Sequence, residues 1–120
     1  LEDMAHEYFE KAGFKDKITM HIGDALEVIP QLNESWDLVF IDADKENYRR
    51  YYDQVIKQMN AGSYIIADNV LWSGKVLKDP DANDDETLAL QEFNDHVQND
   101  ERVENVLLPI RDGLMVCRKL

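Results

Sequence analysis

The fold of this chain is decided by the stretch LVFIDADK, which occupies residues 38–45. A second stretch, YIIADN at residues 64–69, repeats the same order of an apolar run followed by an acid. Continuous apolar runs of this length are typical of strands buried on both faces of a parallel sheet. One helix-length segment separates the two runs, so the sequence predicts a strand–helix–strand unit in which both strands are parallel.

Polar side chains follow the two predicted strands at the point where each strand ends. Asp42 follows the first run, and Asp68 and Asn69 follow the second. The carboxyl ends of adjacent parallel strands meet at the edge of an open α/β sheet where ligands bind. Oxygen donors gathered there suit a divalent cation, with Mg²⁺ expected first and Mn²⁺ or Ca²⁺ as alternatives. The three residues therefore predict a metal site and, with it, an enzyme.

Helix capping is the structural alternative for these acids. Asp is a good N-cap, and for one acid-tipped strand alone we would favour that role. Two such ends on adjacent strands are explained more simply by a shared cation, because burial of an unpaired carboxylate is costly. Lys45 would lie one turn into the next helix, where the charge of a cation favours the neutral amine that a general base requires.

The remaining elements are predicted from hydrophobic periodicity and turn residues. The sequence between the two runs and on either side of them predicts further helices at about 4–12, 25–32, 48–59 and 88–97. A short strand is expected at 18–22, where apolar and polar residues alternate. Asp112-Gly113 between two apolar runs predicts an antiparallel hairpin at the C-terminal end. The predicted class is therefore α/β, with parallel units first and an antiparallel hairpin last.

Composition restricts the partners and the compartment. The chain has 120 residues, enough for one domain, and its 25 acidic and 13 basic residues give a net charge of −12. That charge disfavours nucleic acid and anionic membranes as partners. The single cysteine, Cys117, excludes an intrachain disulfide and lies in an apolar run, which predicts a buried and inert thiol. We therefore expect a cytoplasmic protein that acts on a small molecule.

Two blocks of sequence carry a resemblance to a known family. FIDADKENY at residues 40–48 and DNVLWSGKV at 68–76 resemble the cation-dependent O-methyltransferases of the caffeoyl-CoA and catechol type, and smaller blocks along the chain agree. The resemblance implies a Rossmann-like class I methyltransferase fold with a mostly parallel sheet. It also implies methyl transfer from S-adenosylmethionine to a phenolic, catechol-type hydroxyl, with help from a divalent cation.

The resemblance further implies a role for each matching residue. Asp42, Asp68 and Asn69 match the metal ligands, and Lys45 matches the lysine proposed as the base; Lys45 and Asp42 are therefore the expected catalytic residues. Asp44 and Ala25 match positions that contact S-adenosylmethionine; Asp24 lies beside Ala25, near the adenine, and Asp42 borders the same donor site. Trp72 and Ser73 fall where the acceptor substrate rests.

The resemblance covers only about the downstream half of a family member. The first two strands, the Gly-rich turn and the ribose-binding acid would precede Leu1, and without them the strand at 18–22 would lack its lateral partner. We therefore expect residues 1–120 to be the C-terminal part of one methyltransferase domain, inactive alone, whose complete form is a homodimer. The acidic loop at 79–86 has no basic residue for the phosphates of an acyl-CoA, which argues against a CoA thioester acceptor.

Two other hypotheses stay open at this point. Asp42-Ala43-Asp44 after an apolar strand also resembles the Asp-x-Asp motif of haloacid-dehalogenase-type phosphohydrolases, in which the first Asp is the nucleophile. Lys45 and Glu46 depart from that motif, which usually continues with an apolar residue and then Thr or Val. The other hypothesis is a degenerate fragment that serves as a non-catalytic interaction or structural module.

Overall fold

A four-stranded sheet forms the centre of the structure, a computed structural model that describes residues 1–79 and 84–120. The strands are β1 (Trp36–Ile41), β2 (Met59–Asp68), β3 (Val103–Leu108) and β4 (Leu114–Lys119). Their order is β1-β2-β4-β3. β1 and β2 are parallel, whereas β4 runs antiparallel to both of its neighbours. The predicted parallel unit and the predicted hairpin are both confirmed.

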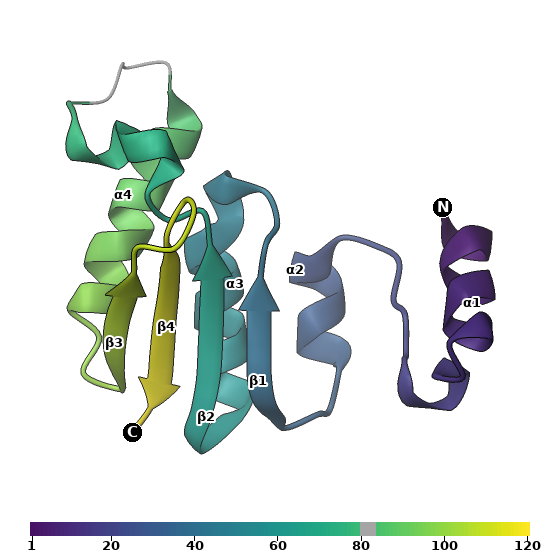
Figure 1. Ribbon diagram of the computed structural model, residues 1–120. Coiled ribbons are helices and arrows are strands. Elements are labelled where there is room, and N and C mark those ends of the chain that lie inside the picture. Colours follow the sequence, from purple (N-terminus) through teal and green to yellow (C-terminus); the bar gives the residue numbers. More distant parts are fainter. Residues whose placement is uncertain (80–83) are drawn as a thin grey trace.

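Helices precede and follow the strands, and not all of them pack against the sheet (Figure 1). They are α1 (Glu2–Lys11), α2 (Ala25–Val28), α3 (Tyr48–Val55) and α4 (Asp85–Gln98), joined by short 3₁₀ turns η1 (Lys15–Lys17), η2 (Ile29–Gln31), η3 (Lys45–Asn47), η4 (Ile56–Gln58) and η5 (Trp72–Leu77). In Figure 1, α3 and α4 lie behind the sheet, α2 lies beside the β1 edge, and α1 stands apart from the sheet. Within the two described ranges, no helix has the length and apolarity to cross a lipid bilayer.

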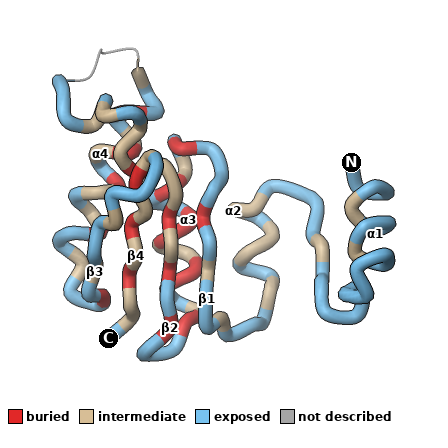
Figure 2. The backbone as a smooth tube through the Cα atoms, viewed as in Figure 1, coloured by how far each residue is buried: buried red, intermediate tan, exposed pale blue. Residues whose placement is uncertain are grey.

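The core lies between the sheet and the two helices behind it. Tyr48 and Tyr52 of α3 and Phe93 of α4 are fully buried, and both tyrosine rings meet Phe93 edge to face, with centroids 5.5 and 6.1 Å away. The buried segments in Figure 2 fall along these helices and the central strands. Cys117 of β4 is buried among them, and burial raises the pKa of its thiol to about 12. The thiol is therefore buried as predicted and stays protonated near neutral pH.

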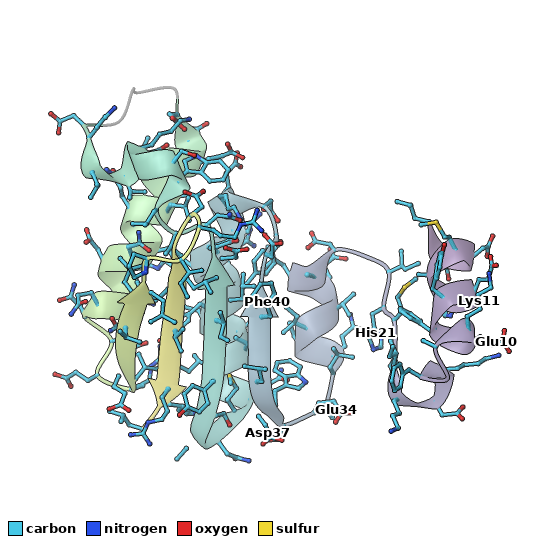
Figure 3. The ribbon with its side chains drawn as sticks, viewed as in Figure 1. Glu10, Lys11, His21, Glu34, Asp37 and Phe40 are labelled. Atoms are coloured by element: carbon cyan, nitrogen blue, oxygen red, sulfur yellow. The ribbon has the colours of Figure 1, made fainter. Side chains whose placement is uncertain are left out.

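No helix among the described residues covers the opposite face of the sheet (Figure 1). Leu38 and Phe40 of β1 are 60% and 57% exposed, and Phe40 is labelled on this face in Figure 3. Phe40 is in register with Ile66, which pairs with Val116, which pairs in turn with the exposed Val106. The prediction that the first strand is buried on both faces is therefore wrong for this chain, because α3 and α4 pack against the same face.

Residues 18–22 form no strand, so the prediction of a short strand in this segment is wrong. The segment is extended at Ile18, but Ile18 is exposed and Ile22 is 65% exposed. A strand is stable only beside a partner that pairs with its backbone groups. No strand among the described residues lies next to this segment, and α2 stands between it and β1 in Figure 1.

Candidate functional site

The carboxyl ends of β1 and β2 lie side by side, at the upper edge of the sheet in Figure 1. Ile41, the last residue of β1, is in register with Ala67 of β2. Asp42 and Asp68, the residues that come next, therefore occupy adjacent positions at this edge. The two acid-tipped strands meet as their parallel order predicts, and the roles of the residues there stay predictions.

Lys45 lies at the centre of this edge. It begins η3 and is only 6% exposed. Its Nζ lies 3.5 Å from Asp42 Oδ1 and 3.2 Å from Asn69 Oδ1, and it also donates to the Tyr48 hydroxyl. An ammonium has three N–H donors, so the three oxygen atoms satisfy the whole group despite its burial. The structure thus brings together three of the predicted site residues.

Asp68 is partly engaged by the backbone beside it. Its Oδ1 accepts a hydrogen bond of 2.7 Å from the backbone N–H of Asn69. Asn69 has a φ of 60°, a left-handed conformation that asparagine adopts more readily than most residues. The Asp68 carboxylate therefore helps to hold the turn that directs the Asn69 amide toward Lys45.

The predicted metal ligands are two carboxylates and one amide. Across the described parts of the chain, no three His, Cys, Asp or Glu side chains are close enough to hold a metal ion. Asp42 Oδ1 and Asn69 Oδ1 nevertheless converge on one positive charge, the Lys45 ammonium. Hard oxygen donors of this kind fit Mg²⁺ or a similar cation, with the remaining positions left to water and substrate. The residues fit such a cation, whose binding stays a prediction.

Asp44 presents a fixed carboxylate beside this cluster. Tyr51 donates to its Oδ1 at 2.6 Å and Asn47 Nδ2 donates to its Oδ2 at 2.5 Å. The Tyr51 bond is the main reason that the pKa of Asp44 lies below its usual value. Burial, and then the same bond, raise the pKa of Tyr51 to about 12. Asp44 is thus held as an anion in one orientation.

The predicted donor contacts border a small cavity. Asp24 caps α2, because its carboxylate accepts from the Leu26 backbone N–H at 2.8 Å. Ala25 and Asp42 both line a cavity of about 250 Å³ between α2, α3 and β1. Asp24 therefore caps a helix, while Ala25 and Asp42 share one hollow.

The loop after β2 carries the predicted acceptor residues in a strained backbone. Trp72 and Ser73 have φ values of 49° and 54°, which lie in the left-handed region that residues other than glycine disfavour. Strain of this kind gathers at functional sites, where the surrounding structure enforces it. Asp112 of the β3–β4 loop supplies that support, since its Oδ1 accepts from the Ser73 N–H at 2.5 Å. The Trp72 ring centroid lies 5.7 Å from Lys45 Nζ.

Two site residues were missed by the sequence analysis, which placed Tyr48 only at the start of a predicted helix and gave Tyr51 no role. Both hydroxyls bond the predicted site residues Lys45 and Asp44. Burial and the nearby Asp42 and Asp68 raise the pKa of Tyr48 far above its usual value, so its hydroxyl stays protonated. The available signal was tyrosine at core positions, because a buried hydroxyl needs a partner.

Two other features lie away from this edge. A cavity of about 690 Å³ lies between η5, α4 and β3, and none of the predicted site residues lines it. Asp84, near the end of the acidic loop, accepts from the Thr87 N–H at 3.2 Å and caps α4. Residues 80–83 of that loop lie outside the described residues.

The fold and the site together define a class. The structure superposes on solved methyltransferases, so the chain has the Rossmann-like fold of the class I methyltransferases. A family model described as O-methyltransferase matches residues 1–120. The chain therefore belongs to the O-methyltransferase family.

Individual relatives show how much of a family member the chain represents. Caffeoyl-CoA O-methyltransferase 1 of Eucalyptus globulus is 37% identical over 92% of this chain and 49% of its own length. Tricin synthase 2 of Oryza sativa subsp. japonica is 34% identical over 98% of this chain and 47% of its own. The Bacillus cereus O-methyltransferase in complex with SAH has a TM-score of 0.86 and 29% identity, covering 98% of this chain and 57% of that one. The chain thus spans about half the length of the curated relatives it matches.

Proposed function

We propose that this chain carries the metal and acceptor half of an O-methyltransferase site. In the complete domain, that site transfers a methyl group from S-adenosylmethionine to a phenolic hydroxyl of the catechol type. The observation that carries the proposal is the position of Lys45 Nζ between Asp42 and Asn69 at the sheet edge. The family match and the SAH in the Bacillus cereus relative support the donor.

The chemistry follows from what these side chains can do. A divalent cation held by Asp42, Asp68 and Asn69 would bind the two catechol oxygens and acidify the one that is methylated. Lys45, once its ammonium has given up a proton, accepts the phenolic proton at Nζ. Trp72 offers a flat apolar wall for the acceptor ring, with Ser73 beside it.

Asp44 and the small cavity serve the donor side of the same site. Asp44, fixed by Tyr51 and Asn47, is an anionic acceptor for the positively charged methyl donor, and Ala25 and Asp24 border the position of its adenine. Methyl transfer is an in-line displacement, so holding donor and acceptor in line supplies most of the rate. Much of the donor site lies outside residues 1–120 in this proposal, and the isolated chain is expected to be inactive.

The test supplies the other half from a relative. Residues 1–120 replace the matching segment of the Bacillus cereus O-methyltransferase, and the chimera is assayed with labelled S-adenosylmethionine, Mg²⁺ and a catechol. We expect methyl transfer that falls about a hundredfold or more in Asp42→Asn. The matched control is Asp37→Asn, an exposed aspartate near the opposite end of β1 (Figure 3), which should keep the activity.

The outcomes separate the hypotheses. A folded chimera that binds S-adenosylmethionine but shows no methyl transfer dependent on Asp42 contradicts the proposal. Methyl transfer by residues 1–120 alone, at the rate of a full-length relative, contradicts only the inactivity of the isolated chain. The comparisons give no support to the phosphohydrolase hypothesis, which requires hydrolysis of a simple phosphate ester that disappears in Asp42→Asn.

A further inference from the structure

The side chain of Tyr48 joins the ends of the two parallel strands. The residue is fully buried at the start of α3, and its ring packs edge to face with that of Phe93. Its hydroxyl donates to the backbone carbonyl of Asp68 at 3.0 Å, and the carbonyl of Ile41 lies 3.4 Å away as a second acceptor. One phenol therefore contacts the last residue of β1 and the last residue of β2.

The same hydroxyl is the third oxygen partner of Lys45. It accepts from Nζ, while Asp42 and Asn69 accept the other two N–H groups. Asp42 and Asn69 belong to the two strand ends that Tyr48 contacts, so both the ammonium and its partners depend on this one residue. The Lys45 side chain has four flexible methylene groups, so burial alone does not fix its Nζ between Asp42 and Asn69.

We propose that Tyr48 is a positioning residue that holds Lys45 Nζ in the gap between Asp42 and Asn69. The importance of Tyr48 for catalysis rests on the proposed function, because Lys45 is the proposed base. The position of the ammonium itself can be measured without catalysis, so the two proposals can fail separately.

The chain contains a matched control for the loss of this hydroxyl. Tyr52 lies one turn further along α3, is also fully buried, and also packs against Phe93. Its hydroxyl donates to Asp100 Oδ2 at 2.8 Å, away from Lys45. Tyr52→Phe therefore removes a buried tyrosine hydroxyl of the same helix and leaves the site untouched.

Lys119 provides an internal reference for the measurement. Its Nζ donates to the backbone carbonyls of Ile56 and Met59 at 2.8 and 2.5 Å. In a chain labelled with ¹⁵N-lysine, ammonium groups held in this way exchange slowly with water and give separate Nζ–H signals in NMR spectra. The Lys45 signal is assigned by its loss in Lys45→Met.

The experiment compares the 120-residue chain with Tyr48→Phe and Tyr52→Phe. We expect Tyr48→Phe to speed proton exchange at Lys45 Nζ by about tenfold or more, or to remove its signal, since one of three hydrogen bonds is lost. Lys119 should not change in either variant, and Lys45 should not change in Tyr52→Phe. Unchanged Lys45 exchange in a folded Tyr48→Phe chain overturns the proposal, as does equal acceleration in both variants.

If the Tyr48→Phe chain does not fold, a second perturbation tests the same proposal in the unmutated chain. Labelling with 3-fluorotyrosine keeps every hydroxyl but weakens it as an acceptor, and the Lys45 Nζ signal should then shift while that of Lys119 does not. An unshifted Lys45 signal overturns the proposal. A Lys45 ammonium held by Tyr48 in this chain, together with a folded chimera that binds S-adenosylmethionine but shows no Asp42-dependent methyl transfer, supports the positioning role and refutes the proposed function alone.

Discussion

Tyr51 donates a hydrogen bond of 2.6 Å to Asp44 Oδ1, and this contact is the main cause of the lowered pKa of that carboxyl. Tyr51 lies one turn into α3, whereas Asp44 precedes the helix, so the helix itself fixes the acid. In the proposed site, the orientation of Asp44 toward the methyl donor is therefore set by a residue that has no role in the chemistry.

Tyr51→Phe should raise the pKa of Asp44 toward its ordinary value of 3.8, because the anion loses its strongest hydrogen bond. The hydrogen bond from Asn47 remains in this variant, so the pKa of Asp44 should not rise above 3.8. The measurement is the pH titration of the Asp44 carboxyl carbon by NMR. Tyr52→Phe is the control, since its hydroxyl bonds Asp100; a pKa of Asp44 that moves equally in both variants would refute the assignment.

Asp42→Asn should weaken the binding of Mn²⁺ to the isolated chain by about tenfold or more, because the amide replaces one of two anionic ligands. Mn²⁺ is chosen because its bound and free forms are distinguished by electron paramagnetic resonance. The exposed Asp37→Asn on the same strand removes the same charge and should leave the affinity unchanged. Equal weakening in both variants would mean that the ion responds only to the net charge of −12.

The sequence predicted the elements whose signals are local. The apolar runs at 36–41 and 63–67, the helical face that begins at Tyr48 and the Asp112-Gly113 turn each contain their own pattern, and each element forms. The strand at 18–22 has an equally clear alternation but depends on a neighbour that the described chain does not supply. The predicted burial of Leu38 and Phe40 was wrong for the same reason, because it requires a second layer of structure on their face of the sheet.

The candidate site divides in the same way. The sequence order of the two strands was enough to predict that Asp42, Asp68 and Asn69 share one edge, because parallel strands end together. Periodicity placed Tyr48 at the start of a helix, but it says nothing about where the Tyr48 hydroxyl finds its partner. The bonds from Tyr48 to Lys45 and Asp68 depend on the distance between two strand ends, which only the fold sets.

Gly113→Ala should destabilise the chain more than Gly62→Ala. Both glycines have positive φ, +83° and +89°, so both variants carry the backbone strain of a left-handed alanine. Only at Gly113 would the new Cβ also clash, at 2.6 Å from Leu71 Cγ. The expected difference is about 1–3 kcal/mol in the free energy of unfolding, measured with urea. Equal losses would show that Leu71 moves aside freely.

The same variant should also disturb the acceptor loop. The backbone N–H of Val70 donates to the Gly113 carbonyl at 3.2 Å, and that of Leu71 donates to the Asp112 carbonyl at 3.0 Å. Displacing Leu71 therefore moves the segment that leads into Trp72. The indole signals of Trp72 in NMR spectra should shift in Gly113→Ala and stay in place in Gly62→Ala.

Asp100→Asn should lower stability at neutral pH and have little effect in acid. The Arg102 side chain is the main cause of the strongly lowered pKa of Asp100, and Tyr52 adds a further hydrogen bond. A carboxyl whose pKa is lower in the folded state stabilises the fold above its unfolded pKa, near 3.8, and loses this effect as the pH falls through its folded pKa. We expect a loss of about 1–3 kcal/mol at pH 7 that shrinks progressively below about pH 4. Urea unfolding of both proteins across this range is the measurement, and a constant difference would contradict it.

Phe40→Thr should reduce self-association of the isolated chain without lowering its stability. Phe40 lies on the helix-free face of the sheet beside Leu38, and both are mostly exposed, so the ring contributes little burial to the fold. An apolar face of this kind, next to the edge of β1 that pairs with no described strand, favours association between copies. Ile65→Thr, on the buried face of the neighbouring strand, is the opposite control, because it should destabilise the fold by removing core contacts.

Sedimentation velocity should show a smaller associated fraction for Phe40→Thr alone, with an unchanged urea midpoint. An unchanged associated fraction would assign association to another surface, and a lowered midpoint would show that Phe40 is buried in solution.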